Sequence, residues 1–319
     1  MNIAKKVSDS TRDGYGRALV ALAEENIDVV AMDCDLGRST RSFRITEVDP
    51  ERFIEMGISE QDMISAAAGM ATMGKTVFVN SFAVFITGRS FSQIRQQIAL
   101  PKSNVKICGS SAGITQGPDG ATHQSVVDVA LMRVLPNMIV LIPADGKQTE
   151  QAVFAAYAYH GPVYLRLSRY ETGNFLPDET GFNIGKAQVI QEGNEIAMIS
   201  CGPILCNVIK AADILKTNGV QAGIINFHTL KPFDNEVMQQ LARKYKKIVC
   251  IEEHSIYGGL GSAVAESLAG FQARRKKPIL HRLGIQDTFG ESGTADELLK
   301  KHKLNPEGIA DSVTKIIGA

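Results

Sequence analysis

Residues 52–80 read RFIEMGISEQDMISAAAGMATMGKTVFVN, which predicts a strand, a tight turn, a helix and a second strand. Glu60 lies at the beginning of this helix, and the residues that follow it at 63–74 carry no charged side chain. A helix that is apolar or small on every face is typical of a protein interior. We therefore expect Glu60 to lie at the mouth of a buried helix, with its carboxyl sequestered from water.

A purely local explanation for the same acid stays open. Ser59 is a favourable helix N-cap, Asp62 follows three residues later as in a capping box, and an acid in the first turn suits the helix dipole. In that interpretation Glu60 has a structural role only.

Apolar runs of strand type alternate with helical patterns along the rest of the chain, which indicates parallel sheets. A length of 319 residues is enough for two domains. Residues 171–185, ETGNFLPDETGFNIG, lose this periodicity, and we interpret them as a linker. The prediction is an α/β protein of two domains, 1–170 and 186–319, each a mostly parallel sheet with helices on both faces.

The composition excludes several classes of partner. Hydrophobic residues make up 44%, charged residues 21%, and the formal net charge is zero, so no general attraction to nucleic acid or anionic membranes is expected. No apolar run approaches the ~18 residues of a membrane span, and residues 1–10 lack the pattern of a secretory signal. The five cysteines have no metal-binding spacing and apolar neighbours, so we expect buried thiols and a cytoplasmic protein.

Three further groups of residues are candidates for chemistry. Phe82 and Phe85 fall on the predicted strand 76–85. Because they are three residues apart, they would point to opposite faces of that strand. The alternative is that both are ordinary core residues. His123 precedes a predicted helix at 124–134, whose dipole would keep it neutral, although a structural histidine is the alternative. The sequence GGLG at 258–261 lacks the third glycine of a dinucleotide loop, so we expect a turn that lets a helix pack closely on a sheet.

The motif GISEQ, followed by an Ala/Gly-rich helix and a strand with aromatic residues, resembles the pyrimidine-binding domain of thiamine-diphosphate enzymes of the transketolase group. The resemblance implies that Glu60 hydrogen-bonds a ring nitrogen of the cofactor's aminopyrimidine. This chemistry needs a dry carboxyl that can hold or share a proton, which burial favours. The resemblance also implies that Phe82 and Phe85 hold the ring and that Asp35 lies near the cofactor's thiazolium end.

The substrate residues come from the same resemblance. DGATHQ at 119–124 is similar to a loop that would place Asp119 and His123 on the donor sugar, with His123 as a second catalytic residue. Arg12 in STRD and Arg169 in LSR would bind the sugar phosphate, because a planar guanidinium gives two parallel hydrogen bonds. Ser39, after the Asp-Leu of DLGRST, would contact substrate as well.

The sequence also departs from the family pattern in ways that limit these assignments. The motif reads SEQ where many members have Arg-Glu-His, and Ser111 stands where many microbial transketolases have a histidine. No Gly-Asp-Gly motif followed by Asn is present, which in this family supplies Mg²⁺ ligands for the diphosphate.

These features predict the C-terminal subunit of a split transketolase. Its N-terminal partner would bind Mg²⁺ and share the cofactor, in an assembly that we expect to be a heterotetramer. The alternatives are a subunit like that of 1-deoxyxylulose-5-phosphate synthase or the 2-oxoacid dehydrogenase β chain, and a non-catalytic assembly subunit. In the transketolase interpretation the cofactor would do the bond chemistry, and the protein would supply orientation and electrostatics.

Overall fold

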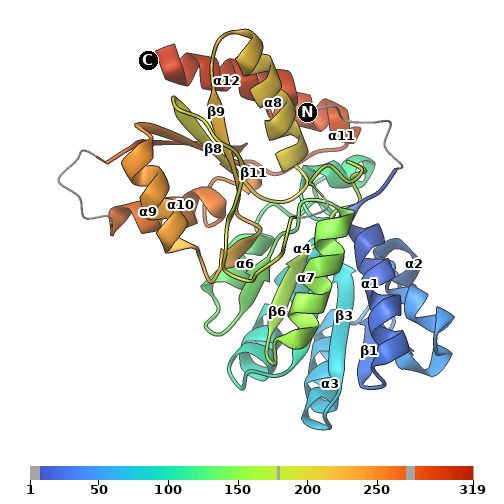
Figure 1. Cartoon of the computed structure of the whole chain (residues 1–319). Helices are drawn as coiled ribbons and strands as arrows, with labels where there is room; N and C mark the ends of the chain where they lie inside the picture. Colours follow the sequence, from blue (N-terminus) through green and yellow to red (C-terminus); the bar gives the residue numbers. More distant parts are fainter. Residues whose placement is uncertain (1–7, 178–179, 271–276, 319) are drawn as a thin grey trace.

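Two α/β units stacked on one another make up the chain (Figure 1). A computed structural model describes residues 8–177, 180–270 and 277–318. The helices of the first unit are α1 (Thr11–Glu25), α2 (Gly37–Thr40), α3 (Glu60–Thr72), α4 (Ala83–Arg89), α5 (Phe91–Gln93), α6 (Asp128–Val134) and α7 (Gly146–Ala158). Short segments of 3-10 helix lie at Ser42–Glu47, Pro50–Arg52 and Ile114–Asp119, and a π-helical segment lies at Ile94–Ala99.

The first sheet has seven strands in the order β10-β5-β6-β4-β3-β1-β2. Six of them come from the first unit and run parallel: β1 (Val29–Asp33), β2 (Phe53–Glu55), β3 (Thr76–Phe82), β4 (Val105–Ser110), β5 (Ile139–Leu141) and β6 (Val163–Arg166). The seventh, β10 (Thr229–Lys231), comes from the second unit and pairs antiparallel with β5.

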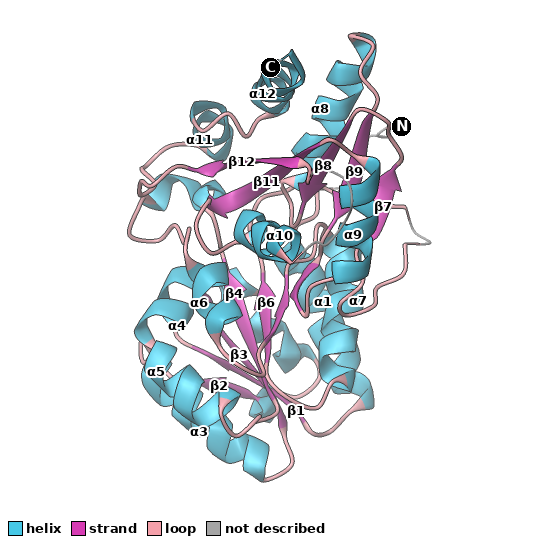
Figure 2. Ribbon diagram, turned by 90° about the vertical axis from the view of Figure 1, so that its left-hand side faces the viewer, coloured by secondary structure: helices cyan, strands magenta, loops and turns pink. Residues whose placement is uncertain are grey.

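Helices cover both faces of this sheet, with α3 to α6 on one side and α1 and α7 on the other (Figure 2). All seven residues of β3 are buried, so its side chains serve both faces. Val77 and Val79 belong to the core on the α3 side, whereas Phe78 packs with residues of α1 and α7. This alternation is the period of two expected of a strand between two helical layers.

The second sheet has five strands in the order β12-β11-β8-β9-β7. Its strands are β7 (Gln188–Gln191), β8 (Ile196–Ser200), β9 (Ala222–Asn226), β11 (Lys247–Ser255) and β12 (Ile279–Ile285), and only β7 runs antiparallel. Its helices are α8 (Leu205–Thr217), α9 (Asn235–Lys244), α10 (Leu260–Ala269), α11 (Ala295–Lys301) and α12 (Pro306–Gly318). Figure 2 shows α9 and α10 on one side of this sheet and α8, α11 and α12 on the other. The predicted fold class is confirmed.

Buried hydrogen bonds from an ion-paired arginine and to a glutamate join the two units. Arg166 at the end of β6 donates from Nε to Asp128 of α6 at 2.8 Å and from Nη2 to the backbone oxygen of Glu253 in β11 at 2.9 Å. The Glu253 carboxylate in turn accepts the backbone N–H of Thr115 at 2.7 Å. Because these groups are buried, each needs its partner, and the two units are held in one relative position.

Three predicted boundaries or burial patterns are wrong. Helix α3 is buried on one face only, through Glu60, Met63, Ile64 and Ala67, and Met73 just beyond it is 81% exposed. The strand that contains Phe82 ends at that residue, not at 85. Helix α6 begins at Asp128, four residues later than expected.

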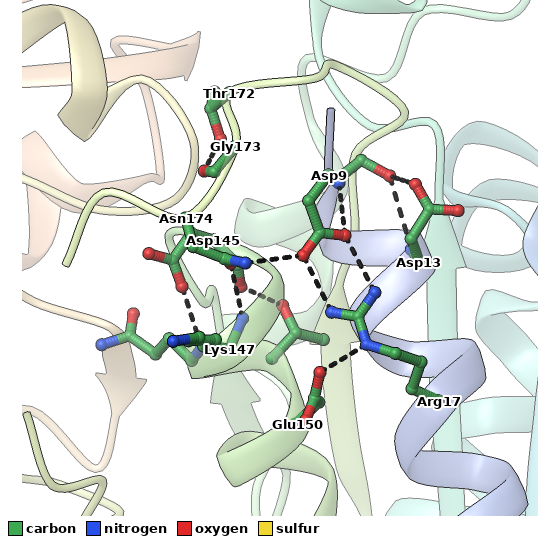
Figure 3. Close-up of polar contacts among 12 residues, drawn as sticks. Asp9, Asp13, Arg17, Asp145, Lys147, Glu150, Thr172, Gly173 and Asn174 are labelled. Carbon is green, nitrogen blue, oxygen red and sulfur yellow. Dashed lines mark hydrogen bonds and ion pairs between the residues drawn. The ribbon is translucent and has the colours of Figure 1, made fainter. Parts of the chain in front are cut away.

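The starts of α1 and α7 are held together with the chain segment after β6 by a polar network (Figure 3). Asp9 forms an ion pair with Arg17 at 2.8 Å and accepts a hydrogen bond from Asn174 at 2.8 Å. Asp145 caps α7 by accepting the N–H of Gln148, and it also accepts two N–H groups of residues 175 and 176. The two helices come so close here that a Cβ on Gly14 would lie 2.1 Å from the backbone oxygen of Gly146.

We predict that Gly14→Ala lowers the free energy of unfolding by about 1–3 kcal/mol, because backbone cannot yield to the added methyl group. Gly69→Ala in α3 is the control, since nothing lies within 4 Å of its Cβ position and alanine favours helix. Urea unfolding of both variants measures the difference. Equal stability of the two variants would contradict the close approach of α1 and α7.

A buried acid in β11 that contacts the start of α10 explains the glycine turn at 258–261. The carboxylate of Glu252 accepts the N–H groups of Leu260 and Gly261 at 2.7 and 2.9 Å. A Cβ on Gly259 would lie 2.0 Å from Glu252 Oε2, so a glycine is required there. Burial raises the pKa of Glu252 to about 7, although the hydrogen bonds from the helix N–H groups act to lower it.

This shift predicts a pH dependence of stability. Between the ordinary pKa of 4.5 and about 7 the folded chain keeps the Glu252 proton that the unfolded chain loses, so the free energy of unfolding falls as pH rises through that window. The contribution is about 3 kcal/mol. In Glu252→Gln this fall becomes smaller by about that amount. The part that remains comes from buried acids such as Asp33 and Glu253, whose pKa is also raised. The exposed Glu24→Gln keeps the full fall, as urea unfolding between pH 4.5 and 8 will show. An unchanged pH profile in Glu252→Gln would contradict the assignment.

Candidate active site

Loops from separate parts of the chain meet at the carboxyl edge of the first sheet. Strand β1 ends at Asp33, β3 at Phe82 and β4 at Ser110, and these three strands are neighbours. Parallel strands bring the loops that follow them to one edge, which is where open α/β sheets bind ligands.

Glu60 lies at this edge, as the first residue of α3. Its side chain is only 4% exposed, and it lines a cavity of about 400 Å³. The other lining residues are Cys34, Asp35, Leu36, Ile58, Phe85, Arg89, Thr122 and His123. The local capping explanation fails for Ser59, whose hydroxyl donates to the backbone oxygen of Met56 instead of accepting from the helix.

The Glu60 carboxylate is paired with a basic side chain. Arg89 Nη1 donates to both carboxylate oxygens, at 3.1 Å to Oε1 and 3.2 Å to Oε2, and the Ser81 hydroxyl lies 3.4 Å from Oε1. A carboxylate withdrawn from water is costly unless it is paired and hydrogen-bonded, and Arg89 supplies that pairing. Arg89 can be recognised as this partner only when the start of α4 at Ala83 is known. Four residues after Phe85, it then lies on the same helix face as Phe85, which lines the cavity beside Glu60.

Two phenylalanines and a histidine form an aromatic wall of the cavity. Because β3 gives way to α4 after Phe82, the rings of Phe82 and Phe85 stack on each other, with centroids 6.0 Å apart and planes 16° apart. The prediction that they lie on one strand is therefore wrong. The His123 ring makes edge-to-face contacts with both rings. Its centroid lies 5.2 Å from that of Phe85 and 6.2 Å from that of Phe82.

His123 lies in a turn, five residues before α6 begins. The expected helix dipole therefore does not act on it, and the hydroxyl of Thr122 lies 3.0 Å from its Nδ1. The aromatic contacts fix the ring at the cavity, where it can face a bound molecule.

The loop after β1 is held by Asp33. This buried carboxylate accepts the N–H of Leu36 and the hydroxyls of Thr40 and Ser42, each at 2.7 Å. Burial raises the pKa of Asp33 to about 6, and the three donors oppose that rise. The loop so formed presents Asp35, which has a positive φ of 63° and is exposed at the cavity. A second hollow of about 590 Å³, lined by Asp35, Ser39 and six further residues, adjoins the first.

The four remaining predicted residues pair with each other at a separate place. Arg12 Nη1 donates to the backbone oxygen of Ser39 at 3.1 Å, and Arg169 lies 3.7 Å from Asp119. Burial lowers the pKa of Arg12, and the nearby positive charges of Arg41 and Arg169 add to this effect. Repulsion among neighbouring guanidinium groups favours an anion between them. The structure thus brings Glu60, Phe85, Asp35 and His123 together at the cavity, with Phe82 behind, while Arg12, Ser39, Asp119 and Arg169 lie outside its lining.

The cavity suits a planar nitrogen heterocycle, because it offers an aromatic face beside a buried hydrogen-bonding carboxylate. Within residues 8–177, 180–270 and 277–318, no group of three or more His, Cys, Asp or Glu side chains could hold a metal ion. None of the helices in those ranges is long and apolar enough to cross a membrane.

Comparison with known proteins agrees with this geometry. Residues 8–174 match the family model of the transketolase pyrimidine-binding domain, and residues 185–309 match that of the transketolase C-terminal domain. The chain belongs to the transketolase family. Thiamine diphosphate use is typical of proteins with this pyrimidine-binding domain, and the family consists of transferase-type enzymes.

Other members of the transketolase family have the same extent as this chain. A Methanocaldococcus jannaschii protein provisionally described as a transketolase C-terminal section is 42% identical, over 95% of this chain and 94% of that protein. The 6-deoxy-6-sulfo-D-fructose transketolase subunit of a Clostridium species is 36% identical, over 96% and 94%. A solved split-gene transketolase, an inactive β4 tetramer, is 38% identical with a TM-score of 0.86, over 98% of this chain and 99% of that one.

We predict that Asp33→Ala lowers the free energy of unfolding by about 2 kcal/mol, because three buried donors of the transketolase-family site lose their acceptor. Asp35→Asn, two residues away and exposed, keeps a side chain that tolerates the positive φ at this position and should change the free energy of unfolding by less than about 0.5 kcal/mol. Chemical unfolding followed by circular dichroism compares the two. A small effect of Asp33→Ala would show that the loop does not depend on this carboxylate.

Proposed function

We propose that the chain is the C-terminal subunit of a split, thiamine-diphosphate-dependent transketolase. It would transfer a two-carbon ketol unit from a ketose phosphate to an aldose phosphate. The observation that carries the proposal is the buried Glu60 carboxylate beside the Phe85 ring and His123 in one cavity. When bound, the cofactor supplies the carbon nucleophile that breaks and forms the carbon–carbon bond.

The residues of the chain have separate tasks in this proposal. Glu60 hydrogen-bonds the aminopyrimidine nitrogen, and Phe85, backed by Phe82, stacks on its ring. Asp35 borders the cavity on the side of the second hollow, towards the thiazolium end. His123 donates to or accepts from the sugar at the cavity wall.

The charged residues outside the cavity bind the substrate. Arg12 and Arg169 would hold the sugar phosphate, since their positive charges already act on one another. Asp119, 3.7 Å from Arg169, and Ser39, whose backbone oxygen accepts from Arg12, would contact the sugar next to that phosphate.

A second polypeptide completes the site in this proposal. The described residues contain no metal-binding cluster, so the Mg²⁺ that holds the diphosphate would come with an N-terminal subunit. Relatives known as a C-terminal section and as a split-gene product, of the same extent as this chain, support that division. The tetramer of the split-gene relative supports self-association, and a heterotetramer would result. All five cysteines are free and buried, which suits the reducing cytoplasm.

The test starts from the native assembly. Affinity purification of the full chain from its source should recover a polypeptide with a Gly-Asp-Gly…Asn motif, and the purified pair should bind thiamine diphosphate in calorimetry. The pair should convert xylulose 5-phosphate with ribose 5-phosphate. Turnover of pyruvate with glyceraldehyde 3-phosphate instead would identify the synthase-like alternative.

We predict that Glu60→Gln lowers turnover of that pair at least about 100-fold, because the carboxyl can no longer exchange a proton with the ring. Glu51→Gln makes the same chemical change on an exposed side chain that precedes β2, away from the cavity, and should leave turnover unchanged. Full activity of Glu60→Gln, with the pair intact, would favour a non-catalytic assembly subunit.

A further inference from the structure

Arg89 makes two contacts in the cavity that a flat nitrogen heterocycle would also make. Its guanidinium carbon lies 4.2 Å from the centroid of the Phe85 ring, and one of its nitrogens donates to both oxygens of Glu60. A guanidinium is planar, carries N–H donors at its edge and stacks on aromatic faces. An aminopyrimidine has the same three properties.

Space at Phe85 makes the two occupants exclusive. Phe85 has three close neighbours. The ring centroids of Phe82 and His123 lie 6.0 and 5.2 Å from its own, and the Arg89 guanidinium carbon is nearer, at 4.2 Å over the ring. Phe82 is buried at the end of β3 and cannot move without disturbing the sheet. A ligand ring that stacks on Phe85 and also hydrogen-bonds Glu60 therefore meets the Arg89 guanidinium, which now makes both contacts.

Arg89 is free to leave, whereas Glu60 is not. The Arg89 side chain is 50% exposed and belongs to the last residue of α4, so it can swing into solvent. The Glu60 side chain is 4% exposed and lies at the start of α3. The backbone oxygen of Arg89 also accepts a hydrogen bond from Gln61 at 2.9 Å, so the main chain stays in place when the side chain moves.

We propose that Arg89 holds the place of the cofactor's aminopyrimidine ring while the site is empty and leaves Phe85 and Glu60 when the ring enters. The inference rests on the proposed function, because it takes thiamine diphosphate as the ligand. Until the ring arrives, the guanidinium keeps the buried carboxylate paired and covers the aromatic face. The cofactor binds by exchange with a side chain, and its affinity is lowered by the free energy of the contacts that Arg89 gives up.

The test measures ring binding directly and does not depend on turnover. The full chain is titrated with 4-amino-5-hydroxymethyl-2-methylpyrimidine, the pyrimidine half of thiamine, and followed by ligand-observed NMR. Arg89→Met keeps the aliphatic stem but removes the guanidinium, and should bind the probe about three- to tenfold more tightly. Arg95→Met removes an exposed arginine six residues further along and should bind it like the unmodified chain.

A second measurement needs no substitution in the site. The side-chain Nε–H resonance of Arg89, assigned by its loss in Arg89→Met, should move towards that of a solvent-exposed arginine as the probe is added. The change should saturate with the same dissociation constant as the ligand signal.

The outcomes separate the two proposals. Probe binding that is equal or weaker in Arg89→Met, or an Arg89 resonance that does not move while the probe binds, overturns the exchange and leaves the proposed function standing. Failure of all three chains to bind the probe overturns the use of the cofactor ring, and the exchange with it.

Discussion

The candidate site of this chain depends on one constraint, which is that parallel strands have all their carboxyl ends at the same edge of the sheet. Strands β1, β3 and β4 are neighbours, and the loop or helix after each of them opens onto the same space. Phe85 follows Asp35 by 50 residues and His123 follows Phe85 by 38, yet all three line one cavity. The sheet fixes these positions before any ligand binds.

At that edge the Glu60 carboxylate is almost fully withdrawn from water. A charge withdrawn from water stays only if a partner offsets the loss of hydration. Arg89 is this partner, and because it is half exposed it can give way. The arrangement combines a rigid acid with a movable cation, which suits a site that has to be stable both with and without a ligand.

The second unit supports the site, although none of its described residues lines the cavity. Gln124, next to His123, donates to the backbone oxygen of Glu291, and Gly113 leaves no room for a Cβ because the Glu253 carboxylate lies against it. The loop between β4 and α6 is thus clamped between the two units. Strand β10 strengthens the same junction, since it comes from the second unit and completes the first sheet. Two units that are separate in the sequence therefore behave as one support for the site.

Much of this could be predicted from the sequence. Alternating strand and helix patterns gave the α/β class and its parallel sheets, because hydrophobic period and turn residues are local properties. The position of Glu60 before an uncharged helix indicated its burial for the same reason. The strands β7 and β10 were not predicted, since three or four residues at the edge of a sheet are strands only through the neighbour they pair with.

The sequence by itself determined the layer order, the residue types at the carboxyl edge and the burial of one acid. Only the tertiary structure decided that Phe82 and Phe85 stack, because the change from strand to helix between them depends on packing and not on their spacing. It alone also decided that His123 lies in a turn and that Arg89 pairs with Glu60. The distance between two side chains on different elements depends on how those elements pack, and no local pattern in the sequence contains that information.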